Sequence, residues 1–68
     1  MTALEAIRSV VDGKRSRGTF PAVALSIEVS RLTGMPLREV DAAAMLLEAQ
    51  GLISIGKSLN YNYYKLAK

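Results

Sequence analysis

Two short segments of the sequence carry residue types that bind anions. Lys14, Arg15 and Arg17 lie close together in the first third of the chain. A second segment, near the C-terminus, holds Lys57, Ser58 and Asn60. Lysine and arginine contact phosphate through charge, whereas serine and asparagine offer neutral hydrogen bonds. The formal net charge of +3 also favours an anionic partner. These residues therefore support binding chemistry rather than catalysis.

Whole classes of catalytic and metal site are excluded by composition, because the chain has no cysteine and no histidine. It cannot form a disulfide, a thiol nucleophile or a Cys/His zinc site, and it lacks the usual general base at neutral pH. The remaining serines, tyrosines and carboxylates show no nucleophile–base spacing, and no glycine-rich phosphate loop is present. We expect no enzyme, no catalytic residue, no metal and no cofactor.

The basic residues belong to a single small domain, expected to span residues 1–68. Hydrophobic residues make up 50% of the chain and charged residues 22%, which is a globular balance. No N-terminal leader is visible, and no apolar stretch approaches the ~20 residues that span a bilayer. We expect a soluble protein without a membrane partner, and the lack of cysteine suits the reducing cytoplasm.

The first element is expected to be a helix over residues 2–12. Thr2 and Glu5 have the spacing of a capping box, apolar residues follow at helical intervals, and Gly13 suits a helix stop. The stretch 14–18 then has no apolar periodicity, which indicates an exposed loop.

The segment from Phe20 to Leu32 fits two patterns. Val23 and Leu25 belong to an alternation typical of a strand, while other apolar residues follow a helix face. The alanines and the stop at Thr33-Gly34 favour a helix over residues 22–32, preceded by a very short strand at Phe20 and Pro21.

The second half of the chain predicts a helix over residues 36–50 and then a β-hairpin over residues 52–66. Pro36 suits the first helical position, an apolar stripe follows, and Gly51 ends the helix. β-favouring segments flank a turn at residues 56–60, and Tyr64 shares a strand face with Leu66. The expected fold class is α+β, with three helices followed by two strands.

Two sequence segments resemble the winged helix-turn-helix family. Residues 29–36, Val-Ser-Arg-Leu-Thr-Gly-Met-Pro, are similar to its helix-turn segment, and residues 46–53, Leu-Leu-Glu-Ala-Gln-Gly-Leu-Ile, are similar to its junction between recognition helix and wing. The resemblance covers nearly the whole chain. In size and order the chain is most similar to short bacterial winged-helix transcriptional regulators, such as those of fimbrial operons.

The resemblance implies binding to double-stranded DNA, with helix 36–50 in the major groove and the wing, which is the hairpin over residues 52–66, on the backbone or minor groove. Arg38 is the residue in this helix suited to reading guanine, and Asp41 can either accept a hydrogen bond from cytosine or be part of a solvated face. The DNA contacts that the resemblance implies are Arg31, Arg38, Asp41, Ala42, Lys57, Ser58 and Asn60. Further phosphate contacts are expected from Lys14, Arg15 and Arg17.

Charge and side-chain size also leave a second interpretation open. Helix 36–50 carries one basic residue, Arg38, and three carboxylates. Its net charge is therefore negative, and phosphate would repel it. Ala42 and the flexible Met45 on the outer face suit contact with another helix. The alternative is therefore an interaction module that uses Ala42 and Met45 to bind a partner protein or to form a homodimer.

Overall fold

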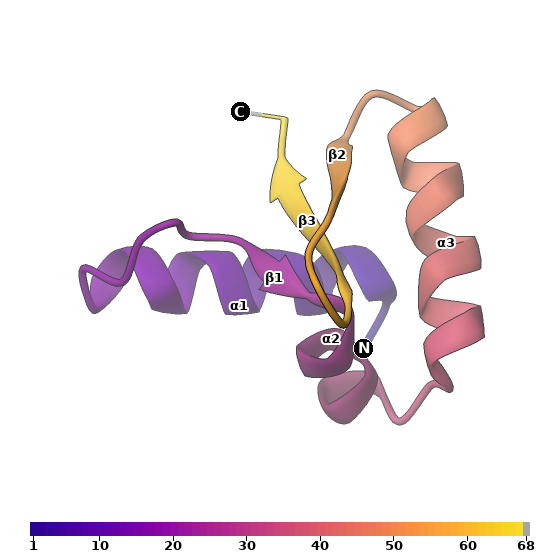
Figure 1. The fold of residues 1–68 in the computed structure, drawn as a ribbon, viewed down its shortest axis with the longest axis horizontal. Helices are drawn as coiled ribbons and strands as arrows, with labels where there is room; N and C mark the ends of the chain where they lie inside the picture. Colours follow the sequence, from indigo (N-terminus) through magenta and orange to yellow (C-terminus); the bar gives the residue numbers. More distant parts are fainter. Residues whose placement is uncertain (68) are drawn as a thin grey trace.

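The computed structural model describes residues 1–67, in which three helices surround one side of a small sheet (Figure 1). Its elements, in chain order, are α1 (Ala3–Ser16), β1 (Ala24–Leu25), α2 (Ser26–Thr33), α3 (Leu37–Ala49), β2 (Ile53–Lys57) and β3 (Asn62–Leu66). The predicted α+β class is confirmed, and the order is that of a winged helix, with the expected short strand before α2 formed by β1.

Helix α1 begins as predicted and ends later than predicted. The Thr2 hydroxyl accepts from the Glu5 N–H at 3.2 Å, and the Glu5 carboxylate accepts from the Thr2 N–H at 2.8 Å, so the capping box is present. The expected stop at Gly13 is wrong, because the helix runs on to Ser16 and Arg17 is its C-cap. Residues 14–16 are thus helical rather than part of a loop. Tertiary contacts of the Lys14 side chain, described below, hold this last turn in place.

The predicted start of α2 is also wrong. Ala24 and Leu25 form strand β1, which pairs antiparallel with Tyr64 and Tyr63 of β3, and α2 begins only at Ser26. The short strand expected at Phe20 and Pro21 is absent there, since both residues lie in a bend before β1. Pairing with a strand some 40 residues away in sequence overrides the local helical preference of this segment.

Helix α3 matches its predicted range to within a residue at each end, with Pro36 as its N-cap. Gly51 follows the helix with φ of 75°, and the Leu52 N–H donates to the Leu47 carbonyl at 3.0 Å. This reversal directs the chain back into β2, as the sequence indicated.

The sheet has the strand order β1-β3-β2, which puts β3 in the centre. Tyr64 of β3 is completely buried and belongs to a core made by all three helices and the sheet. The predicted alternation in β3 is confirmed, because Leu66 is half-buried on the same face while Lys65 is exposed on the opposite one. The other core residues are Ala6, Ile7, Val11, Ala24, Val29, Val40, Ala44 and Ile53.

Two glycine substitutions are expected to change stability in opposite directions. Gly51→Ala should lower the free energy of unfolding by about 1–2 kcal/mol, because an alanine at φ of 75° is strained. Gly13→Ala should raise it by about 1 kcal/mol, because Gly13 lies inside α1. The added Cβ would meet only the mobile end of the Arg17 side chain, at 3.2 Å. Urea unfolding followed by circular dichroism measures both, and equal effects of the two variants would contradict the prediction.

Candidate nucleic-acid interface

Helix α3 lies at the edge of the molecule, with one side packed and the other open (Figure 1). Val40 and Ala44 are buried against the core. The open side carries Arg38, Ala42, Met45 and Ala49, which are spaced by four, three and four residues and are all exposed. These four residues are called the outward stripe below. The stripe has one positive charge and no carboxylate.

Two of the three carboxylates of α3 are turned toward the hairpin instead. Asp41 Oδ1 accepts from the Tyr64 hydroxyl at 2.6 Å and from Asn62 Nδ2 at 3.2 Å. Glu48 Oε2 accepts from the Ile55 N–H at 3.1 Å, at the edge of the sheet. The hairpin thus supplies hydrogen-bond donors to the negative charges that, in the sequence, argued against phosphate near this helix.

The third carboxylate of α3, Glu39, lies on a different flank of the helix. It is one helical turn from Ala43 and two turns from Leu46, and these two residues line a shallow depression between α3 and the start of α1. Glu39 is exposed, but it does not share the outward stripe with Arg38.

The contact between Asp41 and Tyr64 joins α3 to the central strand. Burial and the hydrogen bond to Asp41 raise the pKa of the Tyr64 hydroxyl far above its ordinary value. The phenol therefore stays protonated and remains a donor to Asp41 throughout the physiological pH range. The predicted base contact of Asp41 thus competes with two intramolecular hydrogen bonds.

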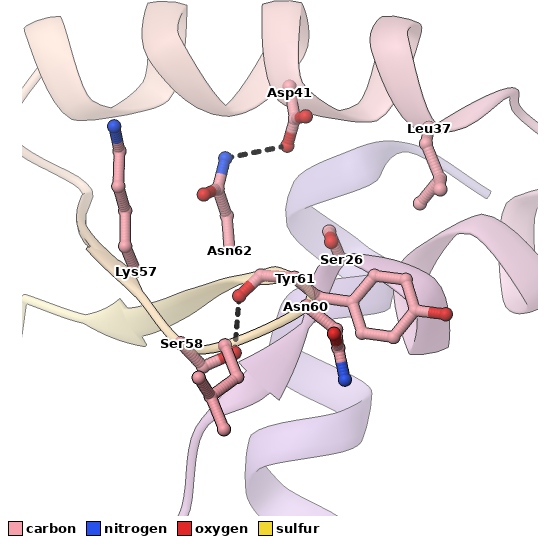
Figure 2. A pocket seen from close by; sticks show the side chains of 9 residues that line it. Ser26, Leu37, Asp41, Lys57, Ser58, Asn60, Tyr61 and Asn62 are labelled. Carbon is pink, nitrogen blue, oxygen red and sulfur yellow. Dashed lines mark hydrogen bonds between the residues drawn. The ribbon is translucent and has the colours of Figure 1, made fainter.

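A cleft of about 220 Å³ separates the first half of α3 from the hairpin loop (Figure 2). Lys57 and Asn62 extend from the hairpin toward α3, and Asn62 reaches Asp41, while the Tyr61 ring lies on the side of Leu37 (Figure 2). Lys57 is exposed and has its ammonium group on the α3 side of the hairpin. The residues that line the cleft are Ser26, Leu37, Asp41, Lys57, Ser58, Leu59, Asn60, Tyr61 and Asn62.

Ser58 and Asn60 lie in this loop, whereas Lys57 is the last residue of β2. The predicted turn at residues 56–60 is therefore wrong at its start, because Gly56 and Lys57 pair with Tyr63 and Asn62 of β3. Asn60 is exposed, and both the N–H and the hydroxyl of Ser58 donate to the Tyr61 carbonyl. Arg31 is exposed in the last turn of α2, one connection away from α3.

The predicted phosphate contacts at the end of α1 are not placed beside α3. The C-terminal end of α1 and helix α3 lie on opposite sides of the molecule (Figure 1). Arg15 and Arg17 are exposed at that distant end. Lys14 is occupied, since its Nζ donates to the Val23 carbonyl at 2.7 Å and pairs with Glu28 Oε1 at 2.8 Å.

The Lys14–Glu28 pair is a structural contact between α1 and the start of α2. Burial tends to raise the pKa of Glu28, but the hydrogen bonds from Lys14 and from the Leu25 N–H outweigh it, and the pKa is lowered. With its side chain only 14% exposed, Lys14 fits this role better than the predicted phosphate contact.

Sequence reasoning did not select two features of the site. Leu59 is fully exposed at 101%, and its only sequence signal is a leucine inside a segment otherwise made of turn-forming residues. The Asp41–Tyr64 hydrogen bond had no signal at all, because it joins residues 23 positions apart.

Within residues 1–67, no group of three acidic side chains is placed to hold a metal ion. None of the three helices described is long and apolar enough to cross a bilayer. No protein-family model, curated protein or solved structure matches the chain significantly.

Proposed function

We propose that this chain is a small winged-helix protein that binds double-stranded DNA and acts as a transcriptional regulator in the cytoplasm, without catalytic activity. The observation that carries the proposal is the outward stripe of α3, which presents Arg38 and no carboxylate, while Asp41 and Glu48 are turned toward the hairpin and accept hydrogen bonds from it. The major groove admits an α-helix, and α3 has an open side along its whole length.

Each residue of the stripe has a contact that suits its chemistry. Arg38 is able to donate two hydrogen bonds to the O6 and N7 atoms of guanine. Ala42 and Met45 supply apolar contacts for thymine methyl groups, so that the helix needs few polar side chains to read a mixed site. Arg31 and Lys57, on either side of α3 in the chain, contact phosphates and fix the orientation of the helix.

A salt titration of duplex binding, measured by fluorescence anisotropy, tests the proposal. Binding should weaken with salt with a log–log slope of about −0.9 for each phosphate neutralised. Lys57→Ala should reduce the slope by about 1. Lys65→Ala is the matched control, because Lys65 is exposed on the sheet face opposite to the one that Tyr64 buries against the core. A folded protein that does not bind duplex DNA at low salt would rule the proposal out.

The second candidate is an interaction module that binds a partner protein or a second copy through α3. Met45 is 67% exposed and lies one turn from Ala42, so another helix could approach this face closely. Under this alternative, DNA binding is weak or absent and substitution of Met45 abolishes the protein contact, whereas substitution of Lys57 does not.

A further inference from the structure

The loop at the tip of the hairpin carries a fully exposed leucine. Residues 58–61 connect β2 to β3, and Leu59 is the most exposed large hydrophobic residue of the described chain, at 101%. The next most exposed are Met1 and Phe20, both at 71%, followed by Leu46 at 68% and Met45 at 67%. Leu59 therefore contributes no packing to the folded domain.

The loop holds this leucine outward in a defined position. The N–H of Ser58 donates to the Tyr61 carbonyl at 3.0 Å, and the Ser58 hydroxyl donates to the same oxygen. Two hydrogen bonds across four residues close the loop at its base. Leu59 and Asn60 are then the two residues that project beyond this closure.

Formation of the turn does not account for a leucine here. Tight turns favour Gly, Asn, Asp, Ser and Pro because these residues satisfy the local backbone geometry and hydrogen bonding. A leucine offers neither advantage, and its side chain leaves its apolar surface in water. An apolar side chain at a fixed tip, between the cation of Lys57 and the amide of Asn60, instead suits a partner with an anionic rim and an apolar interior.

We propose that Leu59 is a wedge that inserts between base pairs in the minor groove of duplex DNA, an inference that rests on the proposed function. Minor-groove proteins commonly insert Leu, Ile, Met or Phe in this way and bend the duplex toward the major groove. The stacked bases supply the apolar interior, Lys57 contacts the flanking phosphates, and the Asn60 amide reaches the acceptors on the groove floor. The wing thus bends DNA rather than only touching its backbone.

Bending of end-labelled duplexes, measured by energy transfer, tests this proposal on the full chain. The probe is an A·T-rich duplex of about two helical turns that contains TA steps, which are easily unstacked. The wild-type protein should bend it by at least ~20°. Leu59→Ser should abolish the bend and weaken binding by about fivefold to tenfold. The loss is modest because the variant no longer buries the leucine but also no longer has to unstack the base pairs.

Two variants serve as controls. Leu59→Phe retains a wedge and should keep the bend. Leu46→Ser removes another exposed leucine, on a flank of α3, and should leave the bend unchanged. Salt-dependent binding by the wild type without a bend, or an equal bend in Leu59→Ser, would overturn the wedge and leave DNA binding intact. No binding of duplex by the folded wild type would overturn the wedge together with the proposed function.

Discussion

Tyr64→Ala is expected to unfold the domain at room temperature. The ring is completely buried in the centre of the sheet, and loss of a buried aromatic side chain costs about 3–5 kcal/mol. In a chain this short, a single hydrophobic core rarely gives a free energy of unfolding above about 3–5 kcal/mol. Circular dichroism should show a loss of helical signal and of the cooperative thermal transition.

Tyr64→Phe separates the hydroxyl from the ring. This variant keeps the packing and removes the donor to Asp41, so it should fold with stability reduced by about 1–3 kcal/mol. In a double-mutant cycle with Asp41→Ala, the two effects should be coupled by about 0.5–3 kcal/mol, because the residues share one hydrogen bond. Tyr61→Ala, at a tyrosine that is 37% exposed, is the control for loss of an aromatic ring. A cooperative melt of Tyr64→Ala near the wild-type temperature would contradict this account of the core.

Arg38→Ala is expected to have the largest effect on DNA binding. A bidentate contact with guanine is worth about 1–3 kcal/mol, so affinity for a selected site should fall by about 5- to 150-fold and specificity at that base pair should relax. Arg38 is exposed on the outward stripe, so its removal should change the free energy of unfolding by no more than about 0.5 kcal/mol. The measurement is binding to a site selected from a random duplex library, compared with single-base variants of that site.

Arg8→Ala is a matched control for Arg38→Ala. Arg8 is an exposed arginine on α1. It lines a depression with Gly51, Leu52, Leu66 and Ala67, at the opposite end of the hairpin from the loop at residues 58–61. The Arg8→Ala substitution should leave the affinity for DNA almost unchanged. If Arg8→Ala and Arg38→Ala weaken binding equally, the arginine of α3 acts only through net charge, and helix α3 does not read the bases.

Local signals in the sequence predicted several features whose interacting groups are close together in the chain. The capping box of Thr2 and Glu5 joins residues three positions apart, and the reversal at Gly51 depends on its own φ and on a hydrogen bond over five residues. The range of α3 and the alternation in β3 follow from periodicity in single segments. These features made the α+β class and the winged-helix order predictable.

Contacts between distant segments account for the features that the sequence did not predict. Lys14 extends α1 beyond Gly13 through its bonds to Val23 and Glu28, and β1 exists because Ala24 and Leu25 pair with β3. Each of these contacts adds a free-energy term that no local propensity contains, and the term is large enough to change a helix end or to replace a helical turn with a strand.

The same distinction applies to the candidate interface. The sequence alone determined which residues α3 carries, including one arginine and three carboxylates, and it indicated a basic wing with Lys57. The three-dimensional fold was needed to show that Asp41 and Glu48 accept hydrogen bonds from the hairpin and that Leu59 projects freely, whereas helical spacing alone puts Arg38 on one face with Ala42 and Met45. Net charge sums over a segment, whereas the surface that a partner meets depends on which side chains accept hydrogen bonds from other parts of the fold.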